Sequence, residues 1–432
     1  MSPLRRAIVW SYAGAMLWAA GNALTSGMLV NYLALDLGAT GIELGWLNAA
    51  PALFGLLRLF TPELTRHWGG SKQTCLATSV VAYVLLGLIP ITVVERPTLG
   101  LGLSPAWLLV VMICVHQLLE QLATVSLFTW LADLVPPPVR RGYFARRALL
   151  QLTVIILALP GSGYLADAMG RDSGNIIRAY AVVVGAGAAV LLISLLPLVQ
   201  MPARSSRRPG ANPNVEPELW LRLRRDLFEP WTNAGSRRLL TFGLWFSFFN
   251  GLTAVAQNLY PKNILRLPLV DMQWMQATMR VGQMGVSAGF GDMSRRIGLR
   301  CLVALCQLLV GLGPLFYLAA TPDRPYLLYG AWILWSAYAG INIALPIWTM
   351  RLSGSQGAGP HLAAYYAWTS LALTVGTLSG GYLFDQLVGW SMNVGPWSID
   401  RYGAAFVLAA ITRTAGVFWV LRIDDDSSPI RR

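Results

Sequence analysis

Apolar stretches of roughly 20 residues, separated by short polar turns, follow one another along the chain. A helix needs about 20 apolar residues to cross the hydrocarbon core of a bilayer. Such stretches lie near residues 8–34, 43–61, 73–94, 106–134, 148–168, 179–200, 239–260, 272–290, 300–320, 326–350, 362–387 and 403–421. The pattern predicts an all-α integral membrane protein with twelve transmembrane helices.

One long polar segment, residues 201–238, interrupts this pattern between the sixth and seventh predicted spans. It divides the chain into an N-terminal six-helix bundle (1–200), a cytoplasmic central loop (201–238) and a C-terminal six-helix bundle (239–432). Within the loop, ELWLRLRRDLFEP alternates Leu or Trp with Arg. This alternation suits an amphipathic helix on an anionic leaflet, and a solvated linker is the alternative.

The placement of Lys and Arg predicts the orientation. With both termini cytoplasmic, roughly 24 of the 33 basic residues lie inside, about 7 outside and two within spans, as the positive-inside rule requires. Without the central loop the asymmetry is still roughly 16 to 7. We therefore expect both termini in the cytoplasm.

Composition supports a membrane protein and argues against other classes. The chain has 432 residues, is 55% hydrophobic and 12% charged, and carries a net charge of +13. A soluble domain of this size needs more polar surface, and the basic residues follow the topology rather than forming a nucleic-acid patch. We expect a multi-pass monomer in the cell inner (plasma) membrane, with the lipid bilayer and a small-molecule solute, and no nucleic acid, as its partners.

Motifs for metal, redox or hydrolytic chemistry are missing from the sequence. The four cysteines stand singly in apolar stretches, and His116 and Glu120 lack the second histidine of an HExxH zinc site. No nucleophile elbow or Walker loop occurs. We expect no metal, no cofactor and no enzymatic activity.

Three short segments recur in the same order in the two halves. NALTSGMLVNY begins at Asn22 and NGLTAVAQNLY at Asn250; PELTRHWG begins at Pro62 and GDMSRRIG at Gly291. The third pair is GYLAD in the fifth span and GYLFD in the eleventh. Transporters are often built from duplicated halves, so the three matches in register favour that construction.

Twelve spans in two halves, with short Gly and Arg turns after spans two and eight, resemble the major facilitator superfamily. Its signature in those turns is Gly-x-x-x-Asp-Arg-x-Gly-Arg-Arg, and GDMSRRIGLR has Arg295 where the family has Asp. In the first half Pro62 and Arg66 replace the leading Gly and the Asp. By resemblance the gate loops comprise Glu63, Arg66, Gly69, Asp292, Arg295, Arg296, Gly298 and Arg300. GYLADAMGR in the fifth span fits the signature better, but charge placement puts it outside, with Asp167 at a helix end.

A polar stripe in the fourth span is the first candidate for chemistry. His116, Gln117, Glu120, Gln121 and Thr124 share one face of an otherwise apolar helix. Ionisable residues inside the bilayer are costly and are usually kept for function. Burial favours a neutral carboxyl and a protonated imidazole nearby favours a charged one, so Glu120 and His116 are proton-coupling candidates. The alternative is a structural interhelical network.

A second stripe lies in the eighth span, where Gln276, Arg280, Gln283 and Ser287 share one helical face. Arg280 could bind an anionic solute, because a guanidinium matches carboxylate or phosphate geometry. It could instead form a structural pair with Glu120. Arg413, flanked by two threonines in the twelfth span, is a weaker candidate because that helix is peripheral in the resembling family.

The resemblance also implies a central cavity lined by the first and seventh helices. Asn22, Thr25, Asn250 and Thr253 would face it, with Trp18, Tyr338 and further residues extending the lining. The substrate-cavity set is Asn22, Thr25, Gln117, Gln121, Trp245, Asn250, Thr253, Gln276, Arg280, Gln283, Trp335 and Asn342. For most tryptophans, interfacial belts and packing are the alternative explanation.

The sequence therefore predicts two six-helix bundles that move a small solute by alternating access, with protons as the possible coupling ion. Two alternatives stay open: a similar receptor or delivery protein that binds without transport, and a membrane-embedded enzyme. The solute, the direction of transport and the coupling ion are not readable from the sequence.

Overall fold

The computed structural model describes residues 3–59, 70–95, 102–202, 219–352, 358–394 and 397–423. The chain forms two compact units. Unit 1 comprises Met1–Ala211 with Arg266–Ala277, and unit 2 comprises Asn212–Leu265 with Thr278–Arg432. One helix, α12 (Leu269–Ile297), therefore contributes its first residues to unit 1 and the rest to unit 2.

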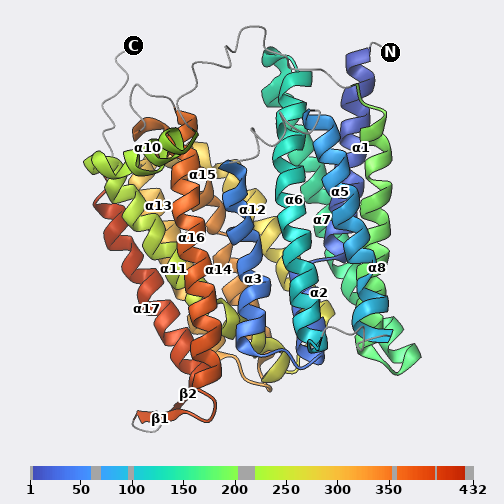
Figure 1. Ribbon diagram of the computed structural model, residues 1–432. Helices are drawn as coiled ribbons and strands as arrows, with labels where there is room; N and C mark the ends of the chain where they lie inside the picture. The colour runs from blue at the N-terminus through green and yellow to red at the C-terminus, as the bar shows by residue number, and fades with distance from the viewer. Residues whose placement is uncertain are drawn as a thin grey trace. The chain divides into compact units, whose positions relative to one another are not determined.

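Unit 1 is a helical bundle (Figure 1). Its elements are α1 (Pro3–Leu24), α2 (Gly27–Asp36), α3 (Gly41–Gly55), η1 (Leu56–Leu59), α5 (Ser71–Gly87), η2 (Pro90–Glu95), α6 (Pro105–Leu134), α7 (Pro137–Ser173), α8 (Ile176–Ile193) and α9 (Leu195–Val199). Helix α1 packs on α7 and α8, and α6 packs on α5 and α3. Close approach of α1 and α8 depends on small residues, because a Cβ at Gly187 would lie 2.7 Å from the Thr25 methyl group.

The first predicted span is two helices rather than one. Helix α1 ends at Leu24 and α2 begins at Gly27, where the Ser26 hydroxyl accepts a hydrogen bond from the Leu29 amide at 3.4 Å. A serine that caps a new helix replaces the backbone partner lost at the break. The expectation of one continuous helix over residues 8–34 is corrected at this point.

Unit 2 is a second helical bundle with one short hairpin (Figure 1). Its elements are α10 (Leu219–Thr232), α11 (Ala234–Asn263), the remainder of α12, α13 (Leu299–Ala319), η3 (Pro325–Leu327), α14 (Leu328–Trp335), α15 (Tyr338–Leu352), α16 (Ala358–Gln386), β1 (Ser391–Val394), β2 (Trp397–Asp400) and α17 (Arg401–Leu421). Helix α11 packs on α16 and α17, and α13 packs on α17. Glycines let α16 approach α11: a Cβ at Gly376 would lie 2.2 Å from the Phe248 carbonyl oxygen.

The hairpin between α16 and α17 is a small exception to the all-α expectation. Strands β1 and β2 are antiparallel, with Ser391 opposite Asp400 and Val394 opposite Trp397. Asp400 then caps α17, since its side chain accepts from the Gly403 amide at 2.8 Å.

The amphipathic segment of the central loop forms a helix. Helix α10 packs on α16 and α11 within unit 2. Trp368 donates its indole N–H to the Leu227 carbonyl at 2.9 Å, and the rings of Phe228 and Trp231 lie 5.8 and 5.7 Å from the Trp368 ring. This docking onto α16 distinguishes the segment from a solvated linker, while its place on a leaflet stays a prediction.

Eight helical segments of the described residues are long and apolar enough to cross a bilayer. Helices also overlap the other predicted spans, but α3 has 15 residues and α12 carries Arg280 in its interior. A short or charged helix gives a weak hydropathy signal. The all-helical membrane fold is confirmed, and the count of twelve and the orientation stay predictions.

Candidate functional site

Glu120 lies in the interior of unit 1, where α1, α5 and α6 meet. Its Oε1 accepts a hydrogen bond from the Trp18 indole N–H of α1 at 3.1 Å. Its Oε2 is buried and has no hydrogen-bond partner among the described residues. Tyr83 and Cys75 of α5 are close enough to interact with the carboxyl electrostatically. Glu120 is thus a half-buried acid whose Oε1 has a firm donor in Trp18 and whose Oε2 is enclosed.

His116, one turn before Glu120 on α6, is held by a different partner. Its Nδ1 lies 3.2 Å from the Ala82 carbonyl oxygen of α5, and its ring faces Tyr83 with centroids 6.5 Å apart. Nδ1 therefore carries the proton that this carbonyl accepts. The two proton-coupling candidates do not bond each other directly, and Tyr83 contacts both.

The rest of the fourth-span stripe is divided among several environments. Gln121 is buried and donates to the Pro51 carbonyl of α3 at 3.4 Å. Gln117 and Thr124 are half-buried. At Gln121 the stripe therefore contacts a neighbouring helix of unit 1. This contact favours the structural interhelical network as the explanation for that position.

Arg147 is a buried charge in the N-terminal part of α7 that the sequence analysis did not single out. Helix α7 begins at Pro137, so RRGYFARR is helical and Arg147 is only 7% exposed. The guanidinium donates to Gln151 Oε1 at 3.3 Å and lies 5.8 Å from the Phe128 ring. Its Nε has no partner among the described residues. Cys75 interacts electrostatically with both Arg147 and Glu120, so a cation and an acid share the interior of unit 1.

The first turns of α12 belong to unit 1 and are held there by polar contacts that the sequence did not indicate. Gln273 is fully buried and donates to the Ser26 hydroxyl at 2.7 Å. Tyr32 donates its hydroxyl to the Leu267 carbonyl at 3.0 Å. Asp167 of α7 accepts from the Val270 backbone, so it caps α12 from another helix. The repeated GYLAD segment thus positions the start of α12.

The predicted cavity residues of unit 2 differ in exposure. Trp245 donates to the Thr412 carbonyl at 2.9 Å, and Tyr338 donates its hydroxyl to Asn250 Oδ1 at 3.0 Å. Asn342 is exposed, whereas Thr253 is fully buried. Trp335 is also buried, at 6% exposed.

The predicted cavity residues at the end of α1 belong to unit 1. Asn22 is exposed, and the Thr25 hydroxyl donates to the Gly21 carbonyl at 3.1 Å.

The eighth-span stripe keeps its spacing on α12 but spans the two units. Gln276 belongs to unit 1, and Arg280 and Gln283 belong to unit 2. Arg280 is exposed and donates to Gln283 Oε1 at 3.2 Å, and Ser287 donates to the Gln283 carbonyl at 2.7 Å. Within unit 2, no carboxylate of the described residues bonds Arg280.

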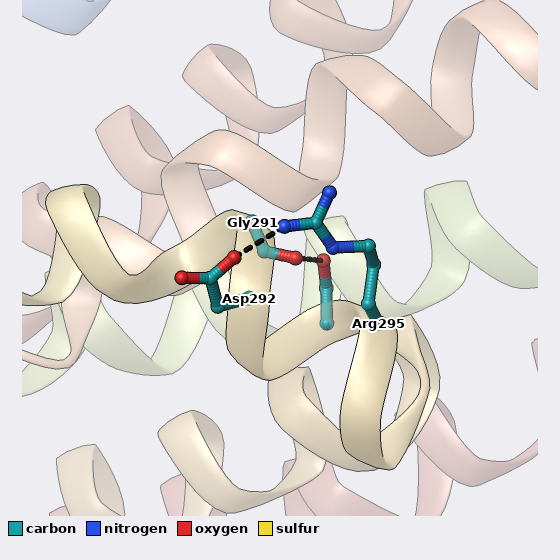
Figure 2. Close-up of polar contacts among 4 residues, drawn as sticks. Gly291, Asp292 and Arg295 are labelled. Atoms are coloured by element: carbon teal, nitrogen blue, oxygen red, sulfur yellow. Dashed lines mark hydrogen bonds and ion pairs between the residues drawn. The ribbon is translucent and has the colours of Figure 1, made fainter.

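The last turns of α12, which carry predicted gate residues of the second half, form a local ion pair. Asp292 bonds Arg295 one turn later, and the Ser294 hydroxyl donates to the Gly291 carbonyl at 3.0 Å (Figure 2). Both members of the pair are well exposed. Gly298 has φ +81°, a backbone conformation that favours glycine and allows α13 to start at once. Glu63, Arg66 and Gly69 lie outside the described residues, and Arg296 is exposed while Arg300 is half-buried.

No group of three His, Cys, Asp or Glu side chains that could hold a metal ion occurs within the described ranges. The four cysteines are unpaired thiols: Cys75 and Cys306 are buried, Cys114 is half-buried and Cys301 is exposed.

Comparison with known proteins identifies similar sequences and folds. The family model of the Major Facilitator Superfamily matches residues 12–377. No curated protein matches the chain in sequence. The match begins within α1 and ends within α16, so it spans both compact units.

Several solved structures are similar over nearly the full length. The nucleoside transporter NupG has 12% sequence identity and a TM-score of 0.66, covering 98% of this chain and 99% of its own. A D-xylose-proton symporter has 14% identity and a TM-score of 0.67, with 98% of each chain covered. A bacterial homologue of the human drug peptide transporters PepT1 and PepT2 has 12% identity and a TM-score of 0.64, with 97% of each covered. These likenesses concern the fold.

Proposed function

Because the chain belongs to the major facilitator superfamily, we propose that it is a secondary active transporter that moves a small solute by alternating access and couples this movement to protons. The similar structures are transporters of nucleosides, peptides and xylose, which supports transport as the activity. The observation that carries proton coupling is Glu120, a half-buried acid whose enclosed Oε2 lacks a hydrogen-bond partner among the described residues.

A carboxyl in this setting is a suitable proton carrier. A charged carboxylate with one unsatisfied buried oxygen is unfavourable, so proton uptake relieves a real cost. The hydrogen bond from Trp18 links the carboxyl to α1, and Tyr83 and Cys75 of α5 interact with the same carboxyl. A change of charge at Glu120 would therefore alter how three helices of unit 1 pack.

For the solute site, we propose that Arg280 holds an anionic group. Its guanidinium is exposed, and Gln283 on the next turn orients it through a neutral bond. Two N–H groups of a guanidinium bind one carboxylate or phosphate in a planar arrangement. The other cavity residues named from the sequence, apart from the buried Thr253 and Trp335, stay proposed solute-binding positions, and His116 is a proposed second proton group.

The proposed setting is the cell inner (plasma) membrane, with both termini cytoplasmic and the protein working as a monomer. The predicted domains, 1–200 and 239–432 joined by 201–238, are the proposed moving halves. Alternating access then consists of one half rocking against the other around the solute.

The test is solute uptake into proteoliposomes with and without a pH gradient. Glu120→Gln removes the titratable charge and keeps the shape, so accumulation driven by the gradient should fail while solute exchange without a gradient survives. Asp133→Asn is the matched control, because Asp133 is an exposed acid on the same helix. Full gradient-driven accumulation by Glu120→Gln would show that Glu120 does not carry the proton.

The same experiment separates the alternatives. A receptor or delivery protein would bind solute and show no exchange across the vesicle wall. An enzyme would convert its substrate in detergent without any gradient. Family membership favours the transporter over both.

A further inference from the structure

Arg413 is a buried cation near the middle of α17. Its side chain is 2% exposed and is among the largest that the described residues enclose completely. A charge removed from water is strongly unfavourable unless a counter-charge or a complete set of acceptors compensates it. The neighbours of Arg413 therefore have to provide that compensation or leave it to a ligand.

The described neighbours of Arg413 are neutral. Its Nη2 donates to Thr253 Oγ1 at 3.1 Å and to Gln257 Oε1 at 3.3 Å, both on α11. Its Nε and Nη1 are buried and have no acceptor within the described ranges. No described Asp or Glu pairs with it. Two donor nitrogens of the guanidinium, Nε and Nη1, are thus unused, and no described counter-charge lies beside it.

Two further unpaired donors belong to side chains that contact the same guanidinium. The ring of Trp335 from α14 lies 5.8 Å from Arg413 Cζ, and the Trp335 indole N–H has no partner among the described residues. The Gln257 amide N–H₂ group is also unpartnered, because that residue uses its oxygen for Arg413. An excess of donors around an uncompensated cation is complementary to an anion.

The enclosure limits the anion to a small one. Thr253, Gln307 and Tyr317 are at most 1% exposed. A Cβ at Gly311 would lie 2.5 Å from Thr414 Oγ1, so α13 and α17 are in direct contact beside Arg413. Gln307 donates to the Arg413 carbonyl at 2.7 Å and ties the two helices together. An organic solute does not fit among side chains this tightly packed.

We propose that unit 2 binds one small monovalent inorganic anion, of the halide or nitrate class, against the Arg413 guanidinium between α11, α14 and α17. This site assigns Thr253 and Trp335 to anion binding rather than to the solute cavity. It goes beyond the proposed transport function and does not rest on it. The anion compensates the charge and uses the donors that α11 and α14 leave free.

Water is the competing occupant. The Gln307 Oε1 atom is a buried acceptor without a donor, and a water molecule satisfies such an atom whereas an anion does not. Water leaves the charge of Arg413 uncompensated. If an anion occupies the site, the stability of the protein depends on the anion in the buffer. If water occupies it, the stability does not depend on that anion.

The experiment measures the unfolding temperature of the full-length protein in detergent while chloride is exchanged for gluconate at constant ionic strength. A ligand that binds the native state raises its stability by mass action, so chloride and nitrate should give a saturable rise that gluconate does not give. Equilibrium binding of radioactive chloride should saturate at one ion per chain. The absence of a chloride-dependent rise and of saturable chloride binding would overturn the proposal in favour of water.

Two variants and one control assign the effect to Arg413. Arg413→Gln should lose the saturable rise and the chloride binding. Gln257→Glu places a carboxylate where Arg413 already bonds, so this variant should remain folded and become independent of chloride. Arg422→Gln, an exposed arginine at the end of the same helix, should keep the response of the unchanged protein.

The Gln257→Glu variant keeps the test decisive if Arg413→Gln fails to fold. A chloride response in Gln257→Glu equal to that of the unchanged protein would show that the anion binds elsewhere. These measurements use no transport assay, so their failure is distinct from a failure of the transport proposal.

Discussion

At the residue scale, the two units accommodate their charged side chains in different ways. In unit 1 a half-buried acid, Glu120, and a buried cation, Arg147, both interact with Cys75. In unit 2 the buried Arg413 has neutral described partners and Arg280 is exposed. Charged residues of one type therefore differ in burial and in partners, which the residue type alone does not determine.

Arg280→Gln should weaken binding of an anionic solute. A hydrogen bond to a charged group contributes about 1.5–3 kcal/mol, which corresponds to a rise in Kd of about tenfold or more. Binding of the solute to the purified protein by calorimetry measures this change. Arg324→Gln, at an exposed loop arginine, is the control. Equal affinities of the Arg280 variant and the unchanged protein would exclude Arg280 from the solute site.

At the element scale, helices are positioned by side chains from other helices. Ser26 caps α2 and also accepts the hydrogen bond of the buried Gln273 at the start of α12. Asp167 caps α12 from α7. Close helix packing depends on glycine, most clearly where α16 contacts the backbone of α11 at Phe248. These contacts join segments far apart in sequence.

Ser26→Ala should destabilise the protein by about 1–3 kcal/mol. The change removes a helix cap and leaves the buried Gln273 amide without its acceptor. Chemical unfolding in detergent micelles gives the free-energy difference. Thr241→Ala is matched, because this hydroxyl bonds only the Arg237 carbonyl of its own helix among the described residues. A loss no larger than that of Thr241→Ala would contradict the double role of Ser26.

Gly376→Ala should also destabilise the protein, by about 1–3 kcal/mol, because the added methyl group meets the Phe248 carbonyl and forces α11 and α16 apart. The thermal midpoint of the purified protein reports the effect. Gly161→Ala serves as the comparison, since nothing lies within 4 Å of the added atom. An unchanged midpoint for Gly376→Ala would mean that the α11–α16 contact is looser than the structure shows.

At the scale of the whole molecule, the predicted orientation can be measured on residues that the structure exposes. In a cysteine-free background, Asp172→Cys at the end of α7 should react with an impermeant thiol reagent in intact cells. Arg295→Cys, in the last turn of α12, should react only after permeabilisation. The opposite labelling pattern would reverse the orientation, and labelling of both in intact cells would contradict the predicted topology.

Hydropathy alone determined that the chain is a helical membrane protein, because about 20 consecutive apolar residues have few other stable environments. The repeats and the GDMSRRIGLR turn correctly indicated the major facilitator superfamily. The stripe around Glu120 was also visible from its spacing, since i and i+4 positions share a helix face. These features are local or periodic, and a sequence records such patterns directly.

Tertiary structure decided which partner each polar side chain has. Spacing suggested that His116 and Glu120 interact, yet the folded chain gives His116 to the Ala82 carbonyl and Glu120 to Trp18. Arg413 was a weak candidate in the sequence and became a buried cation because α11, α13 and α14 enclose it. Some of these partners lie more than 100 residues apart along the chain, as in the Trp18–Glu120 bond. Periodicity tells which face a residue occupies, and only packing tells what that face meets.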